Sequence, residues 1–417
     1  MDCPKTREAE AVAGLPDDPL VEILSRVPVK SLCCCKCVSK AWRDLIADPL
    51  NRKKLPQTLE GFFFVVDGCD DNSDSDDRDG KGIGSDDGDG ENRSDGGDSR
   101  ISVHFIDVFG RPPRPVDHYF PFLTELPGTE EIMLLDGCNG LLLFGCRHGS
   151  GKPSNMSFIV CNPATEQWIA VPKPDKEWPY SSVHLVFDPA SSSHFHLVEI
   201  ENMVLFETVR IYSSNSEVWS PVKTDFGDLH IRYDLHRSAY ANGMVYVVSY
   251  DGMNQILVMD VEGNTRKTIR APLQKGNGFR LCYDYVGQSQ GRLHLICHHV
   301  DLDLGYDEIP PENQSYELLI CVLEDYDREE WVLKDTVSTL KLFGSISPGM
   351  TNDFEVVTIH PDYSLVFLID QHYKDEVLVS YNMDSKEVCR LCTLGTGMSI
   401  FPYVPYFSEL PALENKH

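Results

Sequence analysis

Two pairs of cysteines have the spacing that zinc sites use. Cys34 and Cys37 form one C-x-x-C pair, and Cys389 and Cys392 form the other. A structural zinc ion needs four ligands within reach of one another. Because these pairs lie at opposite ends of the chain, and the first fills apolar positions of a helical pattern, we expect no zinc site. The fourteen cysteines are spread along a long chain without a signal-peptide pattern, which predicts reduced, mostly buried thiols.

Other residue types that could perform catalysis form no recognised pattern. His194 and His196 alternate as they would on one face of a strand, but no third metal ligand stands nearby in the sequence. The chain has neither a G-x-S-x-G nucleophile elbow nor a complete glycine-rich phosphate loop. A glycosidase would need two carboxylates across one pocket, and a sequence does not place such a pair. We therefore expect no catalytic residue, no cofactor and no metal, and a carbohydrate-active enzyme stays open as an alternative.

The chain is strongly acidic, with a formal net charge of −28 over 417 residues. Nucleic-acid binding relies on clustered lysine and arginine, so nucleic acid is not an expected partner. The N-terminus is charged and has no apolar stretch of signal-peptide type, and no run of 18 apolar residues occurs, which argues against secretion and membrane insertion. We expect a soluble protein of the cytoplasm, the nucleus or both.

Residues 67–99 form an acidic tract with 12 aspartates and one glutamate against three basic residues, a net charge of −10. The tract has almost no apolar residues to offset its chain entropy, so we expect it to be disordered. It does not fit a calcium-binding EF-hand loop, because Asn92 stands where the turn glycine is needed if Asp87 is the first position. Since strand-like runs flank the tract, we interpret it as an enlarged loop between two paired strands.

Residues 15–46 predict a small module of three short helices. A first helix ends at Pro28 and has apolar residues at i, i+3, i+4 and i+7, namely Leu20, Ile23, Leu24 and Val27. A second helix follows at residues 29–35, and Ser39 can cap a third that carries Trp42. A unit of about 40 residues rarely closes its own core, so its apolar faces usually dock on another surface.

This stretch resembles the F-box, the adaptor-binding motif of ubiquitin-ligase substrate receptors, in the form common in plants. The resemblance rests on LP at residues 15–16, VEIL at 21–24, PVKSL at 28–32, and CVSK at 37–40 followed by Trp42. Pro19 departs from the usual leucine, and three cysteines at residues 33–35 replace the usual leucine and a basic or aromatic residue. The resemblance implies that a Skp-type adaptor contacts Leu15, Pro16, Leu20, Ile23, Leu24, Val29, Leu32 and Val38, with Trp42 mainly supporting the helical packing. A helical cap packed on its own domain is the alternative.

From Gly61 onward the sequence predicts a β-rich region built from repeats. Short alternating apolar runs are separated by Gly, Pro, Asn and Asp, without a helical period. Each repeat has a first strand, a second strand that ends near Asp or Asn, and a turn into a further strand. Glycine-led first strands stand at residues 140–144, 243–248 and 291–296, and their partners stand at 158–162, 256–260 and 318–322. Trp168, Trp219 and Trp331 each stand at the end of a unit. The first two are separated by about one period of the ~50-residue kelch-type repeat, and the last two by about two periods.

With residues 61–108 counted as the first, roughly six such units predict a β-propeller, which usually has four to eight blades. Radial stacking would bury the faces of each small sheet, and a terminal strand near residues 401–406 could pair into the first blade and close the ring. The region resembles the kelch-like F-box-associated propeller of plant F-box proteins. The resemblance rests on NGLL at residues 139–142, NPAT at 162–165 and YVP at 403–405. A pair of two-sheet sandwiches without closure is the alternative.

The predicted fold is therefore mainly β with a small α module at the N-terminus: a three-helix F-box, then a roughly six-bladed propeller that carries a disordered acidic loop at residues 67–99. We expect a flexible N-terminus at 1–14, the F-box at 15–55, the propeller at 56–410 and a tail at 411–417.

The resemblance implies a non-catalytic substrate-recognition subunit of an SCF-type (Skp–cullin–F-box) ubiquitin ligase. The adaptor would join the chain to a cullin scaffold, and the propeller would bind a target protein that the sequence does not identify. Candidate target-binding residues lie in two predicted loops, at residues 173–180 and 301–314, and are Trp178, Tyr180 and Tyr306. An F-box protein that binds its adaptor outside a ligase, and a propeller-fold carbohydrate-active enzyme, remain alternatives.

Overall fold

The structure is a computed structural model, and its described residues cover the F-box region in part and most of the β-rich region. They are residues 16–27, 32, 35, 38–47, 51, 59–65, 103–107, 120, 131–147, 156–172, 174, 181–189, 191–202, 207–221, 238–248, 255–272, 279–301, 317–344, 354–371, 376–395, 399–406 and 408–413. The acidic tract at 67–99 and the predicted N-terminal segment at 1–14 lie outside these ranges. Within them, no helix has the length and apolar character needed to span a bilayer.

Six antiparallel sheets make up the described β-rich region, and we call them blades 1 to 6. Blade 1 joins strands from both ends of this region in the order β2-β1-β23, with β1 (Gly61–Val65), β2 (Val103–Asp107) and β23 (Ser399–Tyr403). Blade 2 consists of β3 (Glu131–Cys138), β4 (Leu141–Arg147), β5 (Met156–Asn162) and β6 (Gln167–Val171). Blade 3 consists of β7 (Ser181–Val186), β8 (His196–Asn202), β9 (Glu207–Ser213) and β10 (Val218–Trp219).

The remaining three blades repeat the four-stranded order. Blade 4 consists of β11 (Ser238–Ala241), β12 (Met244–Val248), β13 (Gln255–Asp260) and β14 (Thr265–Arg270). Blade 5 consists of β15 (Phe279–Ser289), β16 (Arg292–Asp301), β17 (Glu317–Asp325) and β18 (Glu330–Ser338), and the short helix α6 (Thr339–Phe343) follows it. Blade 6 consists of β19 (Phe354–Ile359), β20 (Leu365–Asp370), β21 (Val377–Asn382) and β22 (Val388–Thr393).

Each blade packs its two faces on its two neighbours, and this explains the apolar runs of the middle strands. In β13, with sequence QILVMD, every residue after the first is buried, because neighbouring blades cover both faces. The outer strand β14, with sequence TRKTIR, buries only Ile269. Burial thus decreases from the middle of this blade toward its outer edge.

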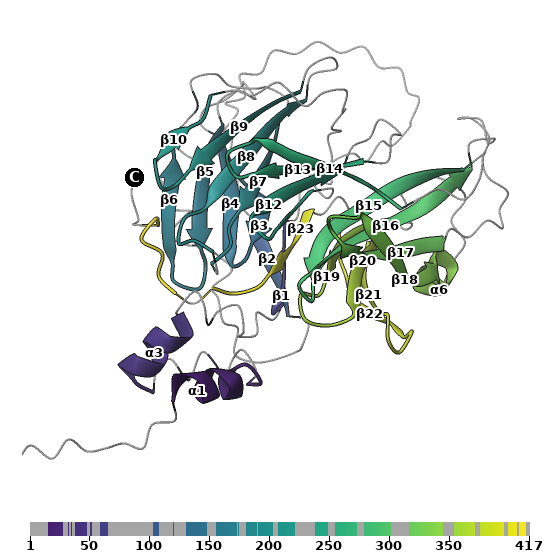
Figure 1. The fold of residues 1–417 in the computed structure, drawn as a ribbon, viewed down its shortest axis with the longest axis horizontal. Helices are drawn as coiled ribbons and strands as arrows, with labels where there is room; N and C mark the ends of the chain where they lie inside the picture. Colours follow the sequence, from purple (N-terminus) through teal and green to yellow (C-terminus); the bar gives the residue numbers. More distant parts are fainter. Residues whose placement is uncertain are drawn as a thin grey trace, which may run out of the picture.

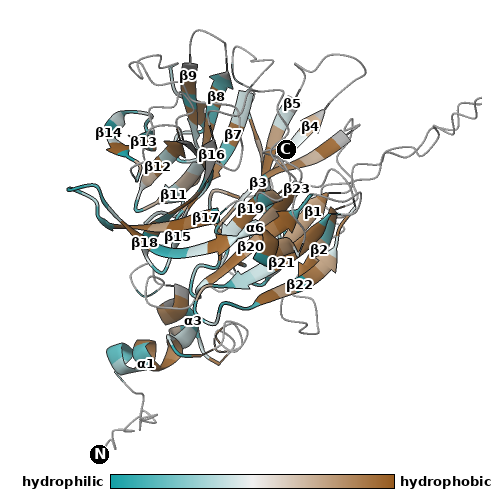
Figure 2. Cartoon of the chain, turned by 90° about the vertical axis from the view of Figure 1, so that its right-hand side faces the viewer, coloured by the Kyte–Doolittle hydropathy of each residue, from teal (hydrophilic) through white to brown (hydrophobic). Residues whose placement is uncertain are grey.

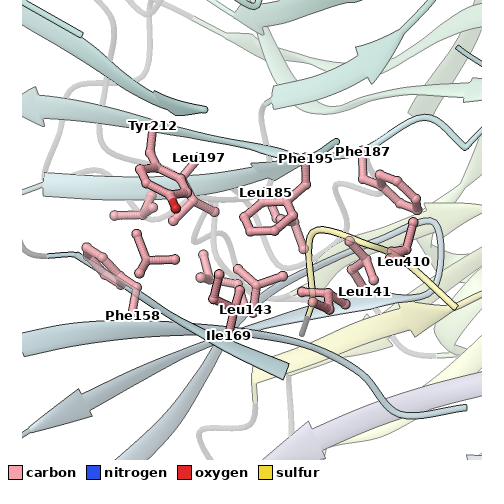
Figure 3. Packing of buried hydrophobic residues seen from close by; sticks show 14 of the residues in the cluster. Leu141, Leu143, Phe158, Ile169, Leu185, Phe187, Phe195, Leu197, Tyr212 and Leu410 are labelled. Atoms are coloured by element: carbon pink, nitrogen blue, oxygen red, sulfur yellow. The ribbon is translucent and has the colours of Figure 1, made fainter. Parts of the chain in front are cut away.

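Six apolar clusters lie at the six junctions between adjacent blades. One of them joins blade 6 to blade 1, and within it the rings of Phe62 and Phe367 meet edge to face with centroids 5.0 Å apart. The cluster between blades 2 and 3 is shown in Figure 3, where Leu143 faces Leu185 and Leu197. Because these junctions run in a closed circle, the structure is a six-bladed propeller, as predicted, and the open sandwich alternative is wrong.

The ring closes through the predicted terminal strand. β23 pairs antiparallel with β1, with Tyr403 opposite Gly61 and Ser399 opposite Val65. On its other edge β1 pairs with β2, so the two strand-like runs that flank the acidic tract are partners, as expected. Strands from near the start and near the end of the chain therefore share one sheet.

The turns explain the small and polar residues of the repeats. Asn139–Gly140, Asn242–Gly243 and Gln290–Gly291 each have positive φ at both positions, as a two-residue hairpin between right-twisted strands requires. Between third and fourth strands, an Asn or Asp side chain accepts backbone N–H groups of the turn that it opens. Examples are Asn162 with Ala164, and Asn382 with Asp384.

Because successive strands of a blade are antiparallel, the connections between them lie alternately at two opposite rims of the propeller. The turns between first and second strands, and between third and fourth strands, share what we call the turn rim. The connections from second to third strands, and from one blade to the next, leave from the opposite loop rim. Since β1 begins beside the end of β23, the F-box side of the chain enters the propeller at the turn rim.

The segment after β23 crosses the turn rim over blades 2 and 3. Leu410 and Leu413 are buried in the cluster between those blades, and Figure 3 shows Leu410 beside Leu141. The Nδ2 group of Asn162 donates to the carbonyl oxygen of Tyr406 at 2.8 Å. The chain is thus packed through Leu413, three residues beyond the boundary that the sequence predicts for the propeller.

Candidate partner-binding surfaces

The first F-box helix, α1 (Asp17–Leu24), is shorter than its apolar pattern predicts. It ends with Ser25 as C-cap, three residues before Pro28, and places Asp17 and Asp18 in its first turn, where the helix dipole favours anions. Its buried residues are Leu20, Val21 and Leu24, whereas Ile23 is 49% exposed. The buried face of α1 therefore includes Val21 in place of Ile23, and it differs in this residue from the i, i+3, i+4, i+7 face that the sequence predicts.

The third predicted helix, α3 (Lys40–Ala47), begins as expected. The Oγ of Ser39 accepts the backbone N–H of Trp42 at 3.1 Å, which is an N-cap hydrogen bond. At the other end, the Nδ2 of Asn51 donates to the carbonyl oxygen of Leu45 at 3.0 Å. Of the predicted second helix, Leu32 and Cys35 are described and both are helical.

The three helices share a small core. Leu20, Leu24, Leu32 and Ile46 are buried in it, and Cys35, Trp42 and Leu45 pack against them. Trp42 thus packs on the helical core. Figures 1 and 2 both show α1 and α3 beside the propeller and not among its blades.

The residues that the F-box resemblance assigns to adaptor contact fall into a buried group and an exposed group. Leu20, Leu24 and Leu32 are at most 6% exposed, so in this structure their side chains face the module itself. Ile23 is 49% and Val38 63% exposed, and these two are the large apolar side chains of the described module that lie open. Pro16 is also exposed, whereas Leu15 and Val29 lie outside the described residues.

Ile23 lies on a charged surface of α1. The neighbouring Glu22 and Arg26 form an exposed ion pair at 2.5 Å, which contributes little to stability because both side chains are solvated. Asp17 and Asp18 are exposed as well. Ile23 is thus an exposed apolar side chain beside a charge-balanced ion pair.

The predicted target-binding residues Trp178, Tyr180 and Tyr306 lie outside the described residues. The strand ends beside them are described, however. Val171 and Ser181 bracket the first loop, and both stand at the loop rim, as do Asp301 and Glu317 around the second. The end of β1 and the start of β2, which flank the acidic tract in the sequence, lie at the same rim. Both candidate loops therefore leave the propeller opposite the rim at which the F-box enters.

Several buried ionisable groups of the propeller are paired within the fold. Glu199 and Arg210 form an ion pair at 2.7 Å with both side chains 4% exposed, and Ser181 donates to the same carboxylate at 2.9 Å. The Oδ2 of Asp284 and the Nδ1 of His298 lie 2.8 Å apart on the neighbouring strands β15 and β16. These two pairs each join side chains of neighbouring strands, β8 with β9 and β15 with β16.

The cysteines and histidines singled out by spacing form no metal-ligand set among the described residues. Cys389 is exposed and Cys392 is partly buried on β22, and burial raises the pKa of Cys392, while Cys34 and Cys37 lie outside the described residues. His196 lies on β8, where burial and the neighbouring His194 lower its pKa, and His194 precedes the strand. Among the described side chains, no three His, Cys, Asp or Glu residues gather as metal ligands would.

Comparison with known families agrees with this architecture. Residues 118–408 match the F-box associated beta propeller domain, and residues 13–54 match the F-box domain. The chain belongs to the F-box associated propeller family. This F-box protein is similar to three F-box proteins of Arabidopsis thaliana. They are At1g47730 (22% identical, over 87% of this chain and 81% of that one), At1g47790 (24%, 78% and 72%) and At5g07610 (26%, 67% and 63%).

Among solved structures, TolB from Acinetobacter baumannii resembles 74% of this F-box protein and 63% of its own chain, at 11% identity and a TM-score of 0.42. This likeness is too loose to bear on function.

Proposed function

We propose that this F-box protein is the substrate-recognition subunit of an SCF-type ubiquitin ligase, acting in the cytoplasm, the nucleus or both. Its F-box binds a Skp-type adaptor, the adaptor joins it to a cullin scaffold, and its propeller binds a target protein. The observation that carries the proposal is the pair of exposed apolar side chains, Ile23 and Val38, on a helical module that matches the F-box. Covering these two side chains with a partner would bury apolar surface and so favour association.

The division of the propeller into two rims supports a separation of tasks. The F-box is tethered at the turn rim through β1, and both candidate target loops leave from the loop rim. A target held at the loop rim would leave the adaptor-binding module accessible. Loops on a rigid scaffold are also where proteins usually place variable recognition residues.

The mechanism that we propose is proximity, without a catalytic group on this chain. Holding a target lysine near a ubiquitin thioester raises its effective concentration, as linking two binding events generally does. We also propose that Leu20, Leu24 and Leu32 act by holding the module in shape for the adaptor, and that Trp178, Tyr180 and Tyr306 contact the target.

Co-purification with a Skp-type adaptor tests the first step. We expect Ile23→Glu with Val38→Glu to weaken adaptor binding by about a hundredfold or more, because two apolar contacts of roughly 1.5 kcal/mol each are lost and two charges are added. Val218→Glu is the matched control, since Val218 is 59% exposed on β10 of the propeller. Equal binding by both variants would overturn the assignment of this surface.

Reconstitution with cullin and a ubiquitin-charged enzyme tests the ligase role. An F-box protein that works in a ligase should enter a complex with adaptor and cullin and promote ubiquitin transfer to a bound protein. Adaptor binding without cullin recruitment would instead support a role outside a ligase. Affinity purification with and without proteasome inhibition then searches for the target, which should accumulate only while degradation is blocked.

A further inference from the structure

The outer strand of blade 5, β18, has an open edge. It is nine residues long, compared with six for β14 and β22 and five for β6. One side of β18 pairs with β17 along its length, and on the other side no strand of the described chain pairs with it. An open strand edge presents a row of backbone N–H and C=O groups that can pair with an added strand.

Two large apolar side chains stand open in the middle of this strand. Val332 is 49% and Leu333 55% exposed. They lie opposite Val322 and Cys321 on β17, so as consecutive residues they point to opposite faces of the sheet. A strand added at the edge would bring cross-strand neighbours to both side chains at once.

β18 is held in place from both sides. On the side of blade 4, the indole N–H of Trp331 donates to the carbonyl oxygen of Arg270 at 2.9 Å. On the side of blade 6, the carboxylate of Asp335 accepts the hydroxyl of Tyr381 at 2.8 Å and pairs with the ammonium of Lys386 at 2.6 Å. Because the strand is fixed by these contacts, an added strand would not have to order it, which lowers the entropic cost of binding.

Basic side chains outnumber acidic ones on the elements around this edge. The outer strands β14, β18 and β22 together with α6 carry six basic and two acidic residues, and two of the basic ones, Arg266 and Lys267, are paired with Asp260 and Glu329. Lys334 stands exposed on β18 itself, at the extra residue of a β-bulge, and forms no ion pair with a described residue. Arg270 and Lys341 are exposed near the two ends of β18, and α6 directly follows the strand in Figure 1.

We propose that the outer edge of β18 binds an extended acidic segment of a partner protein, which adds antiparallel to β18 as a fifth strand of blade 5. Apolar side chains at alternate positions of that segment cover Val332 and Leu333, and an acidic side chain lies near Lys334. Antiparallel addition continues the pairing that all strands of the blade use. The proposal goes beyond the ligase role, because it requires neither adaptor nor cullin.

Fluorescence polarisation with the full-length protein tests this inference. The probe is a dye-labelled nine-residue peptide of alternating valine and threonine with glutamate at its centre, and the comparison peptide has lysine at the centre. We expect saturable binding of the glutamate peptide and weaker binding of the lysine peptide. Val332→Thr with Leu333→Thr should weaken binding by about tenfold, as the loss of two half-covered aliphatic contacts implies.

Matched variants make the result specific. Lys334→Glu should reverse the preference between the two peptides, whereas Val218→Thr, on the outer strand of blade 3, should leave both affinities unchanged. All four positions are exposed, so thermal melting should be the same for every variant. A lysine at an edge can also serve only to discourage pairing. In that case no saturable binding occurs and the proposal fails.

Two further results would overturn it. Equal affinity for the two peptides would show that charge plays no part in binding. A dimer in analytical ultracentrifugation that dissociates in the Val332→Thr, Leu333→Thr variant would show that a second copy of this chain occupies the edge.

Discussion

The indole Nε1–H of Trp331 donates to the carbonyl oxygen of Arg270, 2.9 Å away at the end of the outer strand of the preceding blade. Trp219 makes the same kind of contact at the junction of blades 2 and 3, where its indole donates to the carbonyl oxygen of Pro172 at 2.7 Å. Two of the tryptophans that recur in the sequence repeat, Trp219 and Trp331, are therefore hydrogen-bonded links to the outer edge of the preceding blade.

Replacing these tryptophans by phenylalanine tests the link. Trp331→Phe and Trp219→Phe each keep an aromatic ring but remove the donor, so each should lower the free energy of unfolding by about 1 kcal/mol. The two sites lie in different blades, and the double variant should show the sum of the two effects within about 0.5 kcal/mol. Urea denaturation followed by circular dichroism measures this. Unchanged stability in both single variants would mean that the hydrogen bonds contribute nothing.

Gly140 and Gly243 both have positive φ, but they should differ in how well they tolerate an added Cβ. Gly140 has φ +92° and Gly243 has φ +78°, so alanine is strained at either position. A Cβ at Gly140 would lie 2.5 Å from the backbone nitrogen of Tyr406, whereas a Cβ at Gly243 would meet no atom within 4 Å. We expect Gly243→Ala to cost about 1 kcal/mol. Gly140→Ala should cost at least ~3 kcal/mol, because the backbone after β23 must move. Similar melting temperatures for the two variants would contradict this account.

The blade count and the ring closure could be predicted because their signals are local and repeat along the chain. Asn139–Gly140 marks a hairpin wherever it occurs, and an Asn or Asp at the end of a third strand opens the next turn. Contacts between blades could not be predicted in this way. Trp331 and Arg270 lie 61 positions apart, and nothing local in either residue identifies the other.

The F-box shows the same limit at the level of one helix. Leu20 and Leu24 belong to two overlapping apolar patterns, one that includes Ile23 and one that includes Val21. Both patterns suit an amphipathic helix, and the neighbouring helices decide which face is buried. Here Val21 is 2% exposed and Ile23 is 49% exposed. The sequence therefore identified the module but did not separate its core residues from its free surface.

A buried histidine should make the propeller sensitive to acid. His360 is fully buried, and burial lowers its pKa to about 4. Its Nδ1 accepts the backbone N–H groups of Asp362 at 3.0 Å and Tyr363 at 3.2 Å, so the folded chain holds the neutral ring. Because the folded pKa lies below the unfolded value of about 6.5, this contribution is complete above pH 6.5 and is lost as the pH falls toward 4.

The loss from His360 alone should reach about 3 kcal/mol at pH 4. Chemical denaturation at several pH values between 7 and 4 measures it. His360→Asn keeps an acceptor for the turn but does not titrate, so its stability should fall less steeply over this range. Parallel pH profiles for the wild type and the variant would exclude His360 as the source of the acid sensitivity.

The closing strand and the segment after it should be required for folding. Ile400, Tyr403, Leu410 and Leu413 are each at most 1% exposed. Their burial contributes roughly 6–12 kcal/mol, which is comparable with the whole stability of a typical domain. Ending the chain after Met398 removes all four residues and leaves β1 without its inner partner. We expect this truncated chain to show no cooperative thermal transition, whereas a chain that ends after Leu413 should melt like the full-length protein. If the shorter chain still melted cooperatively near the full-length temperature, the ring would have to be stable without its closing strand, and the pairing of β23 with β1 would contribute little to the fold.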